Sequence, residues 1–310
     1  MPREAFSILQ DYTVVRVLRF DTEDFVLRSF MNIVEFLKVI VFSLVEGFTE
    51  WLPISSTGHL ILLQNIIPLA GTKEFFSTFE VLIQLGAVMA VVQEFFFRLW
   101  PFGKRKKSGG IYLKEEKVIL IGKVLLACLP AAVFGLLLDD FLDQYLYNGF
   151  VVSLMLILYG VFFIVLEQRN ASRKFAFNRV EDLPWTLCLE IGLFQCLALI
   201  PGTSRSGATI IGAMLLSVGR VAATEFSFFL SVPVMAGASL LKLIKHGGHF
   251  SGMEWFTLLL SMVLAYLVSL YCIRFLLRYI RSHDFKIFGY YRIIFGGIML
   301  MWFLVSRFLL

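Results

Sequence analysis

The chain has 310 residues, of which 58% are hydrophobic and 16% are charged, and its formal net charge is +5. Soluble domains contain about 45–50% apolar residues, so this composition indicates a polytopic membrane protein. The charges gather in loops and form neither a basic helix nor an aromatic platform for RNA, so we expect no nucleic-acid partner. The four cysteines lie in apolar segments without metal-ligand or disulfide spacing and are expected to be buried small side chains.

Residues 1–30 differ from the rest because they mix four arginines with five acidic residues. They contain no apolar run of about 7–15 residues and no small-residue cleavage site, so we do not expect them to be a signal peptide. We therefore divide the chain into an N-terminal extension of unknown role, 1–30, and a single integral membrane domain, 31–310.

Six apolar windows are long enough to cross a bilayer, which takes about 20 helical residues. They are 79–97, 118–138, 149–166, 223–244, 255–277 and 287–310.

Two other windows, 58–69 and 207–218, hold about 12 residues each, or about 18 Å of helix, and are too short to span. Each follows a polar break rich in Pro, Gly and Ser, and each break follows another apolar window, 33–49 or 185–200. A helix, a polar turn and a short returning helix predict a re-entrant hairpin. Such backbone is tolerated only where protein or a wet cavity surrounds it.

The basic residues indicate the orientation. They gather in the loops 98–117, 167–184 and 274–286, whereas 139–148 has three aspartates and no cation, and 245–254 has one lysine. The positive-inside rule places the three basic loops in the cytoplasm and the other two outside. The four arginines between 274 and 292 are interpreted as part of this topology signal rather than as a lipid-phosphate site.

With this orientation the first hairpin enters from outside and the second from inside, and three spanning helices follow each. The sequence therefore predicts an all-α polytopic membrane protein built from two inverted-topology repeats, about 33–166 and 185–310. The sites of such folds usually form near the bilayer midplane at the repeat interface.

The first polar break combines two carboxylates with hydroxyls and a histidine. Its residues are Glu46, Glu50, Ser55, Ser56, Thr57 and His59. Glu46 and Glu50 share a helix face, where they either share a proton or bind a cation such as Mg²⁺ or Ca²⁺; the alternative is a solvated pair at a helix end. The hydroxyl run offers N–H donors to an anion at a helix start, or ordinary N-caps. His59 is expected to transfer a proton or contact phosphate, against a purely structural role.

The second polar break carries an arginine among small and hydroxyl residues. Its members are Gly202, Ser204, Arg205, Ser206 and Gly207. The guanidinium fork matches phosphate, and the glycines allow close approach of backbone. The alternative is that Arg205 pairs with a carboxylate for structure, and a Glu50–Arg205 pair could do both. Because a charge in hydrocarbon costs roughly 2.5–3.5 kcal/mol, the two breaks suggest one shared site for a bare or metal-bound phosphate.

These motifs resemble those of the undecaprenyl-diphosphate phosphatase family, also known as the bacitracin-resistance protein family. The matching stretches are 46–50, 53–59, 79–86, 194–198, 201–209, 225–228 and 232–233, and the resemblance runs from about residue 31 to the C-terminus. It implies hydrolysis of undecaprenyl diphosphate to undecaprenyl phosphate and inorganic phosphate, which recycles the lipid carrier of peptidoglycan synthesis. It also implies the bacterial inner membrane, with the active site facing outside.

The resemblance further assigns roles to the residues. Glu46 and Glu50 would hold a divalent cation, Mg²⁺ or Ca²⁺, or manage protons, Ser56 and His59 would lie on the attacking side, and Arg205 would clamp the diphosphate. Whether a serine or a water attacks stays open. The residues expected to contact phosphate are Ser55, Thr57, Gly202, Ser204, Arg205 and Ser206. The expected partners are a polyprenyl diphosphate lipid, the bilayer and a possible second copy in a homodimer.

Two other functions compete with hydrolysis. Inverted repeats with broken helices are a transporter architecture, so the chain could be a transporter or flippase for a lipid phosphate or a small solute. A second class of membrane lipid phosphatase uses a histidine nucleophile, a second histidine and an upstream Lys/Arg-Pro motif. That motif is missing here, and after Arg205 the next histidine is His246, in a loop.

Overall fold

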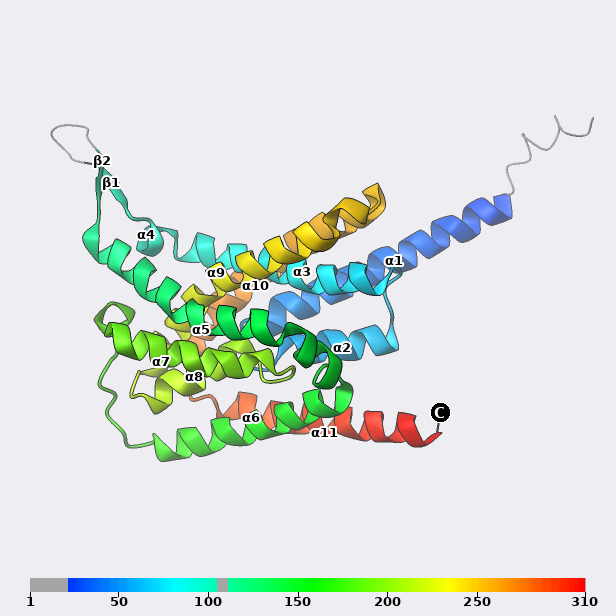
Figure 1. The fold of residues 1–310 in the computed structure, drawn as a ribbon. Coiled ribbons are helices and arrows are strands. Elements are labelled where there is room, and N and C mark those ends of the chain that lie inside the picture. Colours follow the sequence, from blue (N-terminus) through cyan, green and yellow to red (C-terminus); the bar gives the residue numbers. More distant parts are fainter. Residues whose placement is uncertain (1–21, 105–110, 310) are drawn as a thin grey trace, which may run out of the picture.

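The computed structural model describes residues 22–104 and 111–309, and within them helices dominate (Figure 1). The long helices are α1 (Thr22–Thr49), α3 (Lys73–Glu94), α5 (Glu115–Tyr145), α6 (Gly149–Arg169), α9 (Arg220–His246), α10 (Gly252–Tyr279) and α11 (Lys286–Leu309). The short ones are α2 (Ser56–Ile66), α4 (Phe96–Leu99), α7 (Trp185–Gln195) and α8 (Arg205–Leu215), with 3-10 turns at η2 (Val180–Asp182), η3 (Cys196–Leu199) and η4 (Gly247–His249).

The six predicted spanning windows are confirmed by length and composition. Helices α3, α5, α6, α9, α10 and α11 are each apolar and long enough to cross a membrane. Helix α5 runs on to Tyr145, so most of the expected loop 139–148 is helical. Small polar residues begin several of these helices: Thr72 caps α3, Asn148 caps α6, and Ser251 forms a capping box with Glu254 at α10.

The all-α prediction missed a short ribbon of two strands. Strands β1 (Phe102–Lys104) and β2 (Ile111–Leu113) pair antiparallel inside the basic loop 98–117, with Phe102 opposite Leu113. Segments of three residues are too short to show an alternating pattern in the sequence, and only the pairing of the two segments defines the strands.

Most of the expected extension 1–30 falls on residues 1–21, which lie outside the described part of the chain. Helix α1 begins at Thr22, so residues 22–30 are helical and continuous with the first apolar helix. The division of the chain at residue 31 stays a prediction.

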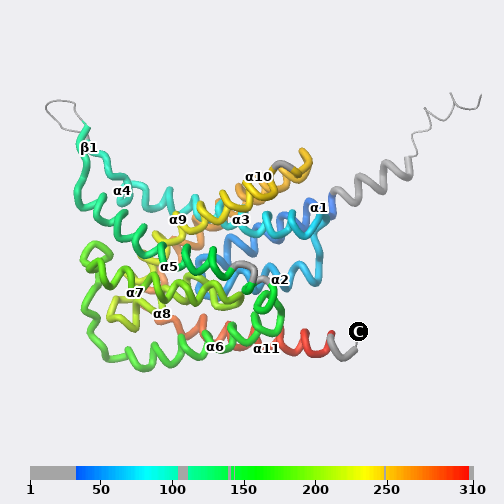
Figure 2. The backbone as a smooth tube through the Cα atoms, in the orientation of Figure 1, coloured from blue at the N-terminus to red at the C-terminus, as the bar shows by residue number. Residues whose placement is uncertain are grey.

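The helices form a layered bundle, traced in Figures 1 and 2. Helices α6 and α11 lie side by side at one edge, and α3, α9 and α10 lie at the opposite edge. Between these layers, α1 and α2 enter from one end of the bundle and α7 and α8 from the other. The α6–α11 contact is close because two glycines face each other: a Cβ on Gly160 would lie 2.7 Å from the carbonyl oxygen of Gly289.

Ion pairs link loops and helix ends at the end of the bundle that carries the basic loops. Arg98 pairs with Glu181 at 2.8 Å and with Glu225 of α9 at 2.7 Å. Burial raises the pKa of Glu181, but the hydrogen bond and charge of Arg98 outweigh it and leave this pKa below its usual value. A second pair joins Arg220 of α9 to Glu167 of α6, and Glu167 also accepts a hydrogen bond from the Phe285 amide.

Candidate active site

Two helix hairpins meet with their turns close together in the middle of the bundle. The first turn (50–55) joins α1 to α2, and the second turn (200–204) joins α7 and η3 to α8. Each short helix starts at a serine with a positive φ, 72° at Ser55 and 71° at Ser204. The Ser55 hydroxyl accepts from the Gly58 amide, and the Ser204 hydroxyl accepts from the Gly207 amide. The N-cap role that the sequence analysis gave as an alternative for the first hydroxyl run is therefore confirmed at Ser55, and Ser204 caps α8 in the same way. Both serines adopt a backbone conformation that non-glycine residues keep mostly at functional sites.

Glu50 connects the two hairpins. The Ser56 hydroxyl donates to Glu50 Oε2 at 2.6 Å, and Arg205 Nη2 donates to Glu50 Oε1 at 2.9 Å. Ser56 and Arg205 are the first residues of α2 and α8, so equivalent positions of the two short helices hold one carboxylate. The structure shows the Glu50–Arg205 pair that the sequence analysis gave as an alternative, and it brings Ser56 to the same carboxylate.

Arg205 is nearly buried and only partly engaged. Its side chain is 10% exposed. Besides the Glu50 contact, Nη1 donates to the Ser227 carbonyl at 2.8 Å. Its Nε atom has no hydrogen-bond partner within the described residues. One guanidinium N–H group therefore remains available for an anion.

Glu46 lies one helical turn before Glu50 and is fully buried. Neither of its carboxylate oxygens has a hydrogen-bond partner in residues 22–104 and 111–309. A buried carboxylate without partners is costly unless it is protonated or binds a cation. In the same ranges no group of three or more His, Cys, Asp or Glu side chains could hold a metal. A cation here would thus need oxygen ligands from substrate or water, which is how Mg²⁺ is commonly bound.

His59 faces helix α11. Its Nδ1 lies 2.8 Å from the Ser55 carbonyl oxygen, and since a carbonyl only accepts, Nδ1 carries the hydrogen. In the neutral ring Nε2 then accepts from the Tyr291 hydroxyl at 2.7 Å. The ring also stacks on Phe295 with the centroids 4.0 Å apart. Both ring nitrogens are thus engaged away from Ser56, and Glu50 is the group that accepts the Ser56 hydrogen bond.

The remaining residues predicted to contact phosphate differ in burial and packing. Ser206 is buried and its hydroxyl lies 3.1 Å from that of Ser204, whereas Thr57 is half-buried. Gly202 has a φ of 89°, and a Cβ there would lie 2.5 Å from the Val152 carbonyl oxygen of α6. The packing of the second turn against α6 therefore requires glycine at this position.

The sequence analysis missed two residues of α11 that touch the site. Arg292 is fully buried and donates to the Pro53 carbonyl of the first turn and the Gly202 carbonyl of the second. Its interpretation as a topology signal is wrong. Its position inside the apolar window 287–310 was the available clue, because an ionisable residue at membrane depth is usually functional. Tyr291, which pairs with His59, gave no such signal.

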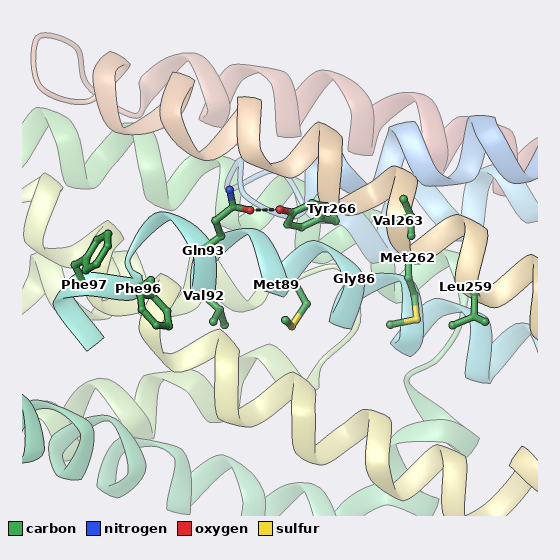
Figure 3. Close-up of a pocket in the computed structure, with 10 residues that line it drawn as sticks. All are labelled: Gly86, Met89, Val92, Gln93, Phe96, Phe97, Leu259, Met262, Val263 and Tyr266. Carbon is green, nitrogen blue, oxygen red and sulfur yellow. Dashed lines mark hydrogen bonds between the residues drawn. The ribbon is translucent and has the colours of Figure 1, made fainter. Parts of the chain in front are cut away.

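A large apolar groove lies away from the two turns. It has a volume of about 680 Å³ and is lined from α3, α4 and α10, with Gly86, Met89 and Met262 among its residues (Figure 3). Tyr266 donates a hydrogen bond to Gln93 at its wall. None of the residues labelled in Figure 3 belongs to the predicted site. The chemistry-bearing groups are therefore those at the two turns.

Comparison with known proteins places the chain in a family. The family model of the bacitracin resistance protein BacA matches residues 39–298, which include both turns. The chain belongs to this family. An undecaprenyl-diphosphatase of Enterococcus faecalis is 50% identical over 271 residues, covering 87% of this chain and 98% of the relative. Another, of Acetivibrio thermocellus, is 50% identical over 273 residues, covering 88% and 99%. Family membership and the six apolar helices together make this a multi-pass membrane protein.

Proposed function

We propose that this protein hydrolyses undecaprenyl diphosphate to undecaprenyl phosphate and inorganic phosphate, and so recycles the lipid carrier of peptidoglycan synthesis. The relatives that share about half of its residues carry the name of this enzyme. The observation that carries the proposal is the pair of contacts on Glu50, from the Ser56 hydroxyl and the Arg205 guanidinium. Cleavage of a phosphoanhydride depends mainly on positioning and on neutralising oxygen charge, and these groups supply both.

The short Ser56–Glu50 hydrogen bond favours Ser56 as the attacking group. Ser56 Oγ would bond to the terminal phosphorus while its proton passes to Glu50. The bond from that phosphorus to the bridging oxygen would break, releasing undecaprenyl phosphate. Water would then hydrolyse the phosphoserine and release inorganic phosphate. In the structure Arg205 shares Glu50 with Ser56, and a diphosphate that draws Arg205 toward itself would leave Glu50 free to accept the Ser56 proton.

Glu46 is the best-fitting ligand for the divalent cation that the family implies. Its two buried oxygens have no partner among the described residues, and Glu50 follows four residues later, just past the end of α1, with its amide donating to the Glu46 carbonyl at 3.0 Å. When bound, Mg²⁺ or Ca²⁺ would neutralise charge on the diphosphate oxygens.

The arrangement also supports an inverted-topology repeat of two re-entrant hairpins in the bacterial inner membrane. The matching serine caps at Ser55 and Ser204 and the equal lengths of α2 and α8, 11 residues each, support a repeat. Three helices long enough to span follow each hairpin. The basic loops support a site that is reached from outside. The homodimer stays a prediction.

Phosphate release from undecaprenyl diphosphate by the purified protein in detergent tests the function. Turnover should disappear in EDTA, and Glu50→Gln should lower kcat at least about 100-fold, or about 2.7 kcal/mol of barrier. Glu190→Gln is the matched control, because Glu190 is an exposed glutamate on α7. A folded wild-type protein that releases no phosphate, but moves a lipid phosphate across a liposome membrane, would favour the transporter instead. Full activity in EDTA would show that the reaction does not need a divalent cation.

A further inference from the structure

We propose that Arg292 is a positioning residue: its guanidinium links the two turns through their backbone carbonyls and so sets where Ser56 and Arg205 stand relative to each other. The chemical consequence rests on the proposed phosphatase function. The structural part of the proposal, that Arg292 acts as a clamp between the two turns, can be tested by a measurement that does not depend on phosphatase activity.

The contacts of Arg292 reach both hairpins. Nη1 donates to the Pro53 carbonyl at 3.1 Å, in the first turn. Nη2 donates to the carbonyls of Gly202 at 2.8 Å and Thr203 at 2.9 Å, in the second turn. Nε points to the Leu156 carbonyl of α6 at 3.4 Å. One side chain of α11 thus joins three other parts of the chain through backbone carbonyls.

These contacts require an arginine. The planar guanidinium offers five N–H donors in fixed directions, whereas the lysine ammonium has three donors on one atom and cannot reach carbonyls on separate turns at once. Within the described part of the chain no carboxylate pairs with Arg292. The Tyr159 ring lies below its guanidinium, 5.6 Å from the ring centroid. A buried cation without a carboxylate is costly, so an arginine at this position points to a role other than ion pairing.

The two bridges between the turns differ in one respect. The Glu50 bridge consists of groups that the reaction would engage, so a diphosphate that draws Arg205 away would weaken it. The Arg292 bridge uses only backbone carbonyls, which substrate leaves alone. Arg292 would therefore keep the turns in place when the other bridge opens. Its charge also lies near the start of α8, since a Cβ on Gly207 would lie 3.4 Å from Arg292 Nη1, and this favours an anion there.

The kinetic test compares Arg292→Lys with the wild type. A misplacement of about 1 Å between reacting groups costs about 100-fold in rate, so we expect kcat to fall about 100-fold. The KM should change less than about threefold, because apolar contacts of the long prenyl chain dominate binding of the lipid and do not involve the turns. A kcat per folded molecule within threefold of the wild type would overturn the proposal.

The mechanical test measures hydrogen exchange of the purified, substrate-free protein by mass spectrometry. Arg292→Lys should raise deuterium uptake in peptides covering both turns, 50–58 and 200–208, and leave the far ends of α3 and α10 unchanged. The matched control is Arg220→Lys, whose bridge to Glu167 joins α9 to α6 away from the turns. Unchanged uptake in both turns would overturn the clamp, whatever the activity. A wild type without phosphatase activity would overturn only the proposed function.

Should Arg292→Lys fail to fold, Tyr159→Leu replaces it. This substitution removes the ring below the guanidinium and leaves all four carbonyl contacts chemically possible. We expect a threefold to tenfold fall in kcat together with raised exchange in both turn peptides. Wild-type exchange and wild-type kcat in this variant would contradict a role for Arg292 in positioning.

Discussion

Single residues of the site hold several partners at once. Glu50 accepts from Ser56 and Arg205, and Arg292 donates to both turns. Such residues tolerate little substitution, because removing one partner leaves another buried polar group unsatisfied. At this scale the effects of conservative changes can be predicted from the atoms that each side chain uses.

Arg205→Lys keeps the positive charge and removes the planar guanidinium with its several N–H donors. Arg205 reaches Glu50 and the Ser227 carbonyl through different nitrogens, and one ammonium cannot hold both and clamp a phosphate. We expect kcat to fall at least about 100-fold, or about 2.7 kcal/mol, in protein that still melts cooperatively in detergent. Phosphate release measured beside a thermal melt checks this. A folded, active lysine variant would remove Arg205 from the phosphate-binding role.

Tyr291→Phe removes one hydrogen bond and keeps the aromatic ring. The lost bond is that from the Tyr291 hydroxyl to His59 Nε2. A neutral hydrogen bond contributes about 0.5–1.5 kcal/mol, so kcat should fall about twofold to tenfold if His59 takes part in the reaction. Tyr290→Phe is the control, because Tyr290 is exposed on the same helix. Equal rates for both variants would assign the His59 contact to structure alone.

Helices are the next scale, and close helix crossings decide their packing. Helix α7 lies against α5 where Gly192 faces Ala127: a Cβ on Gly192 would lie 2.2 Å from the Ala127 carbonyl oxygen. Since backbone cannot yield as a flexible side chain does, this contact fixes the distance between the two helices. The second hairpin is held in place by such contacts as well as by its own turn.

Gly192→Ala should therefore destabilise the protein, by about 1–3 kcal/mol as overpacking does. Gly237→Ala in α9 is the control, because nothing lies within 4 Å of a Cβ there. That second change should leave the melting temperature unchanged or slightly higher. Detergent thermal melts of the two variants provide the comparison, and an equal melting temperature for both would contradict the close α5–α7 contact.

For the whole molecule, orientation in the membrane decides from which side the substrate arrives. Because the positive-inside rule predicts that the basic loops lie in the cytoplasm, a cysteine at His249, between α9 and α10, is expected to react with an impermeant thiol reagent on intact cells. One at Ser172, in the loop 167–184, should react only after lysis. Both positions are exposed, and both changes should be made in a variant without Cys128, Cys188, Cys196 and Cys272. The opposite pattern would give the site access from the cytoplasm.

The amino-acid sequence by itself determined the number and place of the long apolar helices, the two polar breaks and the charge balance of the loops. Lengths of apolar runs and residue types carry this information locally, so the apolar windows that overlap α3 and α9 and the candidates Glu46, Glu50 and Arg205 could be predicted. Only the tertiary structure decided which atoms meet. Ser56 joins Arg205 on one carboxylate, His59 turns to Tyr291, and Arg292 holds both turns. These contacts link residues up to 239 positions apart, and the packing of α6, α8 and α11 creates them, which no local pattern records.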